Sequence, residues 1–470
     1  MKMLIAGRWL DKEERIEVRN PFDGSVIDTV PAADSSDVEQ ALESAVRGFE
    51  EMRRLSARER SEILGRAAEL LEQRAEEFAL TIAKEVGKTL REAQTEVNRA
   101  TQTIRIASEE AKRISGETVP FDATAGAEAK IGFYMRVPVG VVLAITPFNV
   151  PLNLACHKVA PAIAAGNSVI LKPATATPLA DLMLGQVFLD AGLPPEAMNI
   201  VTGRGASLGE PLISDPRVRM VTFTGSPEVG ESITKMAGLK KTAMELGSNS
   251  CAIVMDDADI ANAAARIRQG GYAVAGQVCI SVQRVIVHDS VYDEFLEEFV
   301  PLVAKIRTGD QLDASTDMGP MISEDAAERV EAWIDEAVSA GASTLLPVRR
   351  EGAVVKPTVL TDVSCDMKVW TEEVFGPLVA VVKCRDFDHA IELANTSKYG
   401  LQAGIFTKNL NYALRAAREI EVGGVMVNEV PTFRIDAMPY GGVRLSGFGR
   451  EGPKFAIEEM TELRLVAFQM

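Results

Sequence analysis

Three residues stand in local contexts that favour chemistry. Cys279 follows Gly276 closely, and a glycine permits a sharp bend beside a thiol that is a good nucleophile once ionised. Glu245 comes between a strand-like apolar run and a glycine turn, where α/β proteins place functional groups. Asn149 follows another apolar run, where its amide can stabilise an oxyanion. Taken singly, Cys279 equally fits a buried structural cysteine, whereas Glu245 alone fits a solvated carboxylate better and Asn149 alone fits a turn asparagine better.

Two glycine turns can bind phosphate. An apolar run leads into Gly225 and Ser226, and a glycine turn that opens a helix presents free N–H groups to an anion. The run from Gly203 to Gly209 is similar to a dinucleotide fingerprint with one extra residue, although such a pattern alone also fits ordinary turns. Lys172 ends a further apolar run and can reach a ribose or a phosphate.

The composition excludes several classes of protein. The 470 residues hold 50 Lys and Arg against 67 Asp and Glu, a net charge of −17, which argues against a nucleic-acid partner. With 47% hydrophobic residues the chain can bury a large core without disulfides or metal. The 5 cysteines are scattered and form no CxxC pair, which indicates a reducing compartment, and the 3 histidines are too dispersed for a zinc site.

One uncharged stretch, residues 137–156, is long enough to span a bilayer. It contains three prolines and divides naturally between Thr146 and Pro147, so a buried strand, a turn and a helix fit it better. The N-terminus does not have the form of a signal peptide. We therefore expect a cytoplasmic protein that does not cross a membrane.

The elements that must position these residues alternate between strands and helices. Short apolar runs, the candidate strands, occupy residues 139–145, 168–171, 198–201, 220–223 and 251–255. Between them, the sequence predicts a helix over 178–191 with Thr177 as its N-cap. A second alternation follows Cys279. Buried strands that alternate with helices indicate parallel sheets covered on both faces, here as two α/β domains that meet near residue 247.

Together, and in this order, the motifs resemble the aldehyde dehydrogenase family over essentially the whole chain. The separation of Glu245 and Cys279 matches that of the family's base and nucleophile, and Asn149 matches its oxyanion residue. The segments 371–377, 438–442 and 446–452 match further family signatures.

The resemblance implies oxidation of an aldehyde to a carboxylic acid with a nicotinamide cofactor. Cys279 would attack the aldehyde, Asn149 and the Cys279 N–H would stabilise the oxyanion, and Glu245 would activate the water that hydrolyses the thioester. Cofactor contacts are implied at Thr146, Pro147, Phe148, Lys172, Thr175, Gly205, Gly225, Ser226, Leu246, Glu373 and Phe375.

The choice of cofactor depends on one position. Lys172 matches the family lysine at the adenosine ribose, and Thr175 stands where many NAD-preferring members carry a glutamate. A neutral side chain there removes a charge that would repel a 2′-phosphate. We therefore expect NADP, or tolerance of both NADP and NAD, and no metal.

The substrate is predicted from two basic residues and from local likeness. His157 and Arg434 fall in segments that frame the family's substrate pocket, and an arginine there can bind an anion or simply pair with Asp436 or another carboxylate. The sequence around Cys279 and Arg434 looks most like the branch of lactaldehyde and phosphonoacetaldehyde dehydrogenases. A small polar or anionic aldehyde is therefore expected, with succinic semialdehyde and glyceraldehyde 3-phosphate as alternatives. Val278, where several anion-specific relatives place an arginine, weakens the strongly anionic options.

The resemblance also implies the domain plan. A Rossmann-like cofactor domain would span 1–117 and 138–247, a catalytic α/β domain 248–445, and a small β oligomerisation element 118–137 and 455–470. An edge strand in this element offered to a second copy would give a homodimer or homotetramer.

Two other classes of function stay open. A CoA-acylating enzyme is disfavoured by Glu245, which members that transfer the acyl group to coenzyme A tend to lack. A catalytically silent binding protein is expected to have lost at least one of Cys279, Glu245 and Asn149, and all three are present. Ser248 departs from the family's usual glycine and can limit the movement of Glu245.

Overall fold

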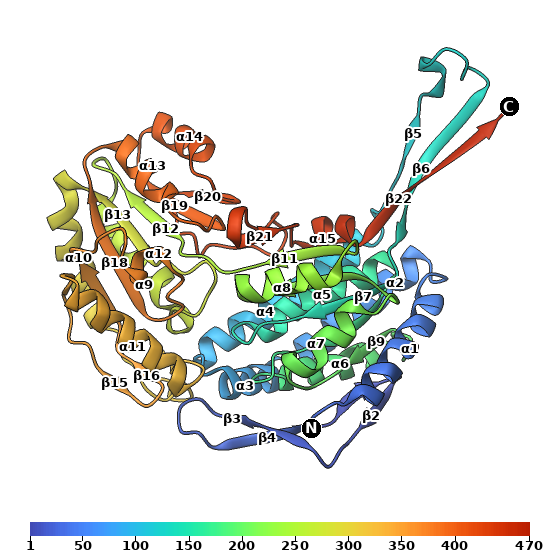
Figure 1. Cartoon of the computed structure of the whole chain (residues 1–470), viewed down its shortest axis with the longest axis horizontal. Helices are drawn as coiled ribbons and strands as arrows, with labels where there is room; N and C mark the ends of the chain where they lie inside the picture. The colour runs from blue at the N-terminus through green and yellow to red at the C-terminus, as the bar shows by residue number, and fades with distance from the viewer.

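The computed structural model describes all residues from 1 to 470. Two lobes, each built around a β-sheet, form the body of the molecule, and a third, small sheet projects from it (Figure 1). No helix combines the length and the apolar character that a membrane crossing requires.

The first lobe is centred on an eight-stranded sheet in the order β2-β1-β9-β8-β7-β10-β11-β21. Its five central strands are parallel, and the edge strands pair antiparallel. The chain builds outward from β7 through β8 and β9, and then returns to place β10 on the other side of β7. Ligands bind outside the carboxyl ends of strands at such a reversal. The strands are β1 Met3–Ile5, β2 Arg8–Leu10, β7 Val141–Ile145, β8 Ser168–Lys172, β9 Met198–Ile200, β10 Val218–Thr224, β11 Lys241–Glu245 and β21 Gly447–Phe448.

Helices cover both faces of this sheet, beside a hairpin of β3 Arg15–Arg19 and β4 Val26–Pro31. The central helix α5 follows β7, begins with a proline and ends at left-handed Gly166, as helix starts and stops commonly do. The helices are α1 Ser35–Met52, α2 Ala57–Gln73, α3 Ala75–Val86, α4 Leu90–Glu110, α5 Pro151–Ala165, α6 Leu179–Asp190, α7 Gly205–Ser214, α8 Pro227–Ala237 and α15 Pro453–Glu459.

The predicted helix over 178–191 is present as α6, but its predicted cap is wrong. Thr177 does not cap the helix, because its hydroxyl donates to the Phe148 carbonyl (3.3 Å). The first N–H groups of α6, on Leu179 and Ala180, donate instead to the buried Glu85 carboxylate of α3 (2.8 and 3.0 Å). A tertiary contact replaces the local cap that the sequence pattern predicts.

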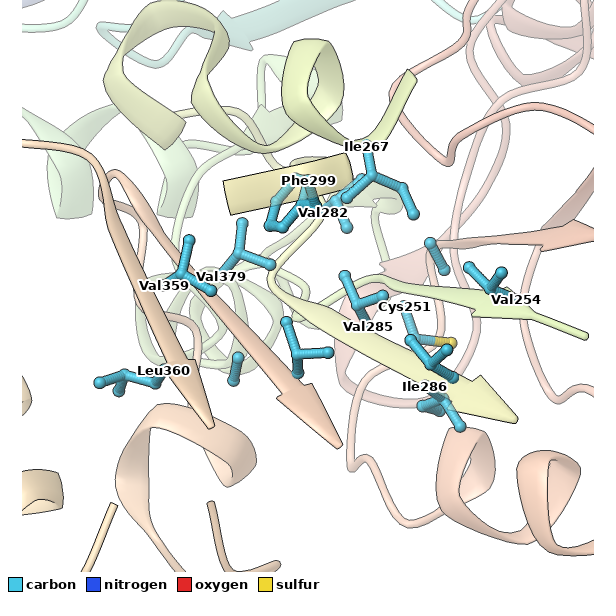
Figure 2. Close-up of a cluster of buried hydrophobic side chains, with 14 of the residues drawn as sticks. Cys251, Val254, Ile267, Val282, Val285, Ile286, Phe299, Val359, Leu360 and Val379 are labelled. Carbon is cyan, nitrogen blue, oxygen red and sulfur yellow. The ribbon is translucent and has the colours of Figure 1, made fainter. Parts of the chain in front are cut away.

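The second lobe holds a seven-stranded sheet in the order β14-β17-β18-β13-β12-β19-β20, parallel except for β14. Its core includes Val285 and Ile286 of β13 and Val379 of β18, with Ile267 and Phe299 from the helices α9 and α10 (Figure 2). The strands are β12 Cys251–Val254, β13 Arg284–His288, β14 Ser343–Thr344, β17 Thr358–Thr361, β18 Leu378–Cys384, β19 Gln402–Phe406 and β20 Gly424–Val427. A separate hairpin joins β15 Arg350–Glu351 and β16 Val354–Val355. The helices are α9 Ile260–Tyr272, α10 Tyr292–Ala304, α11 Glu324–Ser339, α12 Lys368–Thr371, α13 Phe387–Asn395 and α14 Leu410–Glu419.

The third sheet consists of β5 Glu117–Val119, β6 Lys130–Pro138 and β22 Thr461–Gln469, with β6 in the centre. It reaches beyond both lobes, and the C-terminus lies at its tip (Figure 1). Two α/β lobes and a small β element are the architecture that the sequence predicted, so the predicted fold class is confirmed.

Candidate active site

Cys279 lies on a tightly turned loop that follows α9. Val274 and Ala275 both adopt left-handed backbone conformations, with φ of 53° and 54°, which side chains of this kind rarely tolerate. Gly276 has a φ of 71°, and a Cβ there would lie 2.1 Å from the Gly376 carbonyl oxygen, so this position requires glycine. The loop leaves Cys279 partly exposed.

The Cys279 thiol contacts the Tyr440 hydroxyl, with Sγ and Oη 2.9 Å apart. Burial raises the pKa of the thiol to about 11, while the Tyr440 hydrogen bond and the charge of Arg434 act in the opposite direction. The thiol is therefore mostly protonated at neutral pH in this state.

Asn149 lies four residues beyond the end of β7, just before α5, and is buried. Its Nδ2 donates to the Gln277 carbonyl oxygen (2.7 Å), two residues before Cys279. Its Oδ1 has no hydrogen-bond partner in the chain. The amide is thus tied to the loop that carries the thiol.

Glu245 is the last residue of β11, and neither of its carboxylate oxygens has a partner in the chain. Burial and the nearby charge of Glu451 hold the pKa of Glu245 well above its usual range. A carboxyl group that is buried and unpaired and has a raised pKa is suited to exchange a proton with a water molecule. The Ser248 hydroxyl, which can limit Glu245, pairs with the Ser250 hydroxyl (3.0 Å).

A buried charge network lies behind these residues. Lys158 donates to Glu451 (2.9 Å) and to Thr222 (3.2 Å), and Arg434 donates to the other Glu451 oxygen (2.9 Å). Burial alone would raise the pKa of Glu451, but Lys158 and Arg434 lower it to about 2. The Arg434 guanidinium lies 3.7 Å from the centroid of the Tyr440 ring, so the network reaches the contact partner of the thiol.

A cavity of about 750 Å³ opens beside Cys279, and we call it the cofactor-side cavity. Cys279, Glu245 and Asn149 all line it. Seven predicted cofactor residues line it as well, namely Pro147, Phe148, Gly225, Ser226, Leu246, Glu373 and Phe375. It lies at the carboxyl ends of β7, β10 and β11, where the order of the sheet reverses.

The glycine turn, a buried glutamate and two aromatic rings of this cavity are the groups that would contact a dinucleotide. Gly225 and Ser226 precede α8, whose first N–H groups and positive dipole end favour phosphate. Glu373 accepts from the Ser248 N–H (2.9 Å), and burial raises its pKa to about 7. Phe148 and Phe375 meet edge to face, with ring centroids 5.8 Å apart.

Four predicted cofactor residues do not line this cavity. Thr146 is buried and donates to Asp181 (3.0 Å). Lys172 is buried and donates to the Pro173 carbonyl (2.9 Å), and desolvation lowers its pKa to about 8. Thr175 donates to the Gly203 carbonyl (3.1 Å), which brings it close to Gly205 at the start of α7.

A second cavity, of about 770 Å³, lies beside the loop that carries Cys279, although Cys279 itself lines only the cofactor-side cavity; we call it the substrate-side cavity. Val278 and Ile280, the neighbours of Cys279, line it, as does Val150, the neighbour of Asn149. Its cationic lining comes from Lys88, Arg91, Arg99, Arg268 and Lys305.

The cations of this cavity differ in how they are paired. Arg99 of α4 donates to Asp436 (2.8 Å), and the buried Lys88 donates to Glu96. Arg268 of α9 is half-buried and makes no ion pair or side-chain hydrogen bond. Arg268 is therefore free to bind an anionic ligand.

The structure places the two predicted substrate residues behind the cavities. His157 is buried and its Nε2 lies 3.0 Å from Asp436. Arg434 is bound to Glu451, as described above, and lines neither cavity. Asp436 links the buried His157 to the substrate-side cavity, because it also accepts from Arg99, which lines that cavity, and from Asn153.

Several residues at the site escaped the sequence reasoning. Tyr440 belongs to the quoted 438–442 signature, and this signature was the available signal for it. Arg99 and Arg268 carry no motif, since charges on helices usually mark a solvated face. The chain holds no group of three or more His, Cys, Asp or Glu side chains placed to bind a metal ion.

Comparison with known proteins agrees with this geometry. The model of the aldehyde dehydrogenase family matches residues 9–466. A 3-sulfolactaldehyde dehydrogenase from Priestia aryabhattai is 49% identical over 468 residues, which cover 100% of this chain and 98% of that protein.

Two crystal structures superpose closely on the whole chain. One is aldehyde dehydrogenase 21 from Physcomitrella patens in complex with its product succinate, with 39% identity, a TM-score of 0.96 and coverage of 100% of this chain and 98% of the other. The other is an NADP-dependent glyceraldehyde-3-phosphate dehydrogenase from Bacillus halodurans complexed with NADP, with 37% identity, a TM-score of 0.97 and coverage of 100% and 99%. The chain therefore belongs to the aldehyde dehydrogenase family, as its motifs predicted.

Proposed function

We propose that the protein oxidises a small anionic aldehyde, such as a sulfonated or phosphorylated lactaldehyde-like compound, to its carboxylic acid with NADP or NAD. The observation that carries this proposal is the position of the Cys279 loop between two cavities of similar volume, with Cys279 lining one and its neighbours Val278 and Ile280 lining the other. One cavity has the glycine turn and helix N-terminus that suit a dinucleotide, and the other has unpaired cations. The similarity to a 3-sulfolactaldehyde dehydrogenase supports the same substrate class.

The protein's own residues divide the chemistry among them. The Cys279 thiol first passes its proton to water, and the thiolate sulfur then bonds to the aldehyde carbon, while the Asn149 amide and the Cys279 N–H stabilise the oxyanion. For this step Asn149 must exchange its bond to the Gln277 carbonyl for one to the substrate. A nicotinamide cofactor, which the residues of the cofactor-side cavity would hold, would supply the hydride acceptor, and loss of hydride from the adduct would leave an acyl thioester on Cys279. Glu245 then takes a proton from water, and the resulting hydroxide breaks the thioester.

The cofactor residues favour NADP. Thr175 and Lys172 lie at the edge of the sheet where α7 begins, and the contact of Thr175 with Gly203 brings Arg204 to the same place. Lys172 and Arg204 supply two cations near Thr175, which suits a 2′-phosphate, and the carboxyl group that acts on Lys172 is the buried Asp181. A related dehydrogenase crystallised with NADP supports this choice.

The substrate-side cavity supports an anionic substrate. Val278 supplies no cation next to the thiol, but Arg268 and Arg99 line the same cavity from two helices. We propose that they bind the anionic end of the aldehyde, and that His157 and Arg434 act from behind through Asp436 and Tyr440. Succinic semialdehyde and glyceraldehyde 3-phosphate fit the same charge pattern and remain the alternatives.

The projecting sheet supports the predicted assembly. One of its faces carries exposed Ile131, Phe133 and Phe468, with the rings of Phe133 and Phe468 6.3 Å apart. Exposed apolar side chains of this kind favour burial against a second copy, in a homodimer or homotetramer. We also propose a cytoplasmic location and domain limits at residues 117, 138, 247 and 445. The end of β11 at Glu245 and the start of β12 at Cys251, in different sheets, support the limit at 247.

The test is the absorbance of reduced nicotinamide with purified protein, NADP and NAD in parallel, and a panel of aldehydes. The panel contains 3-sulfolactaldehyde, lactaldehyde, succinic semialdehyde and glyceraldehyde 3-phosphate, with Cys279→Ala as the control. We expect reduction that requires Cys279, is fastest with an anionic aldehyde and yields the free acid. Turnover that requires added coenzyme A would identify an acyl-transferring enzyme instead, and cofactor binding without turnover would favour a silent binding protein.

A further inference from the structure

One carboxylate outside the residues assigned so far joins α4 to the loop that carries Cys279. Glu92 is the third residue of α4, and its Oε2 accepts from the N–H (2.9 Å) and the hydroxyl (2.8 Å) of Thr89, which completes a capping box. Its Oε1 accepts from the Val274 N–H (2.8 Å) on the other lobe. One carboxylate thus fixes a helix start and a loop at the same time.

The backbone that Glu92 holds is an unfavourable one. Val274 and Ala275 are consecutive left-handed residues, and a β-branched residue such as valine is a true exception in that region. Such a conformation persists only where the surrounding structure enforces it. A charge-assisted hydrogen bond to the Val274 N–H is a contact of this kind.

The same turn is connected to the reacting groups. The Val274 carbonyl accepts from the N–H and from Nε2 of Gln277 (both 3.1 Å). Gln277 in turn accepts from Asn149 at its carbonyl (2.7 Å) and from the Ile322 N–H at Oε1 (3.0 Å). A displacement at Val274 would therefore reach both Asn149 and the thiol two residues beyond Gln277.

We propose that Glu92 is a positioning residue, whose carboxylate holds the Val274–Ala275 turn and thereby sets the place of the Cys279 thiol relative to Asn149. The proposal rests on the proposed function, because it takes Cys279 as the nucleophile. Glu92 also lines the substrate-side cavity, so its effect is measured with a neutral aldehyde, on which its charge acts least.

The chain offers a matched control for the loss of a capping box. Glu59 is the third residue of α2 and accepts from the N–H (2.8 Å) and hydroxyl (2.7 Å) of Ser56, in the same motif as Glu92. It is half-buried, like Glu92, and lines neither cavity. Glu59→Ala therefore removes the cap alone, whereas Glu92→Ala removes the cap and the hold on the loop.

The experiment compares kcat, KM for NADP, thermal unfolding and the alkylation rate of Cys279 by iodoacetamide. We expect both alanine variants to lower the unfolding temperature, and Glu92→Ala to lower it more, because it also leaves the Val274 N–H without its partner. Only Glu92→Ala should lower kcat, by about 100-fold, as expected for a misplaced reacting group, with little change in KM for NADP. Its Cys279 should also react faster with iodoacetamide, because the displaced thiol is more exposed. Glu92→Gln, which keeps an oxygen for the Val274 N–H, should restore most of kcat.

The proposal is overturned if Glu92→Ala keeps kcat within twofold of the wild type, or if Glu59→Ala loses as much. If the wild type itself oxidises no aldehyde, the proposed function fails. In that case the alkylation rates still decide the question, since an unchanged rate in Glu92→Ala would refute the role of Glu92 and a raised one would support it.

Discussion

The two cavities on either side of the Cys279 loop are alike in volume and differ in the balance of their charged side chains. The cofactor-side cavity has more carboxylates than cations, with Glu228, Glu245, Glu372 and Glu373 against Arg329 and Lys368. In the substrate-side cavity the cations prevail, with Lys88, Arg91, Arg99, Arg268 and Lys305 against Glu92, Glu96 and Asp317. Both proposed ligands are anions, so the difference lies in how each is bound. A helix N-terminus serves the dinucleotide, and guanidinium groups serve the aldehyde.

The largest expected effect comes from a residue of the cofactor-side cavity. Glu245→Gln keeps the shape of the side chain and removes the base that activates water, so steady-state turnover should fall about 100-fold to 10,000-fold. The first turnover, which ends at the thioester, should persist as a burst of about one reduced nicotinamide per site. Stopped-flow absorbance measures both phases. A variant that loses the burst along with steady-state turnover would contradict a role confined to hydrolysis.

The raised pKa of Glu245 leads us to expect a rate of thioester hydrolysis that depends on pH. Because burial and Glu451 raise the pKa of Glu245, its carboxyl group keeps its proton to a higher pH than an exposed glutamate does, and while protonated it cannot act as a base. Hydrolysis of the thioester should therefore accelerate as pH rises toward that pKa. Steady-state rates across pH, compared with the burst rate at each pH, separate this step from attack by the thiol. A hydrolysis rate that falls with rising pH would contradict this assignment.

The next largest effect is expected at Arg268, in the substrate-side cavity. Arg268→Met removes an unpaired cation and keeps the length of the side chain. For an anionic aldehyde, kcat/KM should fall about 10-fold to 100-fold, the value of a hydrogen bond to a charged group. Uncharged lactaldehyde should be little affected. Arg58→Met is the control, since Arg58 is exposed and paired with Glu62 on α2. Equal losses for charged and uncharged aldehydes would argue against anion binding.

A smaller effect is expected at the adenosine end of the cofactor. Thr175→Glu adds a negative charge near the proposed site of the 2′-phosphate, whereas Thr175→Gln adds a side chain of the same size without charge. The glutamate variant should lose about 10-fold in affinity for NADP relative to the glutamine variant and keep its affinity for NAD. Fluorescence titration of the reduced cofactors measures both. A parallel loss of NAD would show that Thr175 acts only through shape.

The smallest effect concerns the thiol. The Tyr440 hydroxyl lowers the pKa of Cys279, so Tyr440→Phe should raise that pKa further and slow alkylation by iodoacetamide about 2-fold to 10-fold. Because the pKa of the wild-type thiol is about 11, its alkylation rate should climb steadily from pH 7 to pH 10. Faster alkylation in the variant would mean that Tyr440 shields the thiol more than it stabilises the thiolate.

The two cavities also differ in how far the sequence predicts them. Asn149, Glu245 and the turn at Gly225 follow the ends of strands, where short motifs combine with sheet topology to place them. Arg99 and Arg268 lie within long helices, and which helical face meets a cavity depends on packing between distant segments. The same reason explains the wrong cap at Thr177, since Glu85, remote in sequence, takes its role. Short motifs therefore predict the catalytic residues at strand ends, but they do not predict the side chains on helices that are proposed to select the substrate.

The central claim is that two separate anion sites meet at Cys279, and one binding measurement tests it. A three-carbon sulfonated carboxylic acid of the product type is titrated by calorimetry into the protein, first free and then saturated with NADP. We expect the acid to bind in both cases with affinity within a few-fold, because each cavity holds its own ligand. Competition, in which saturation with NADP abolishes binding of the acid, would contradict the account.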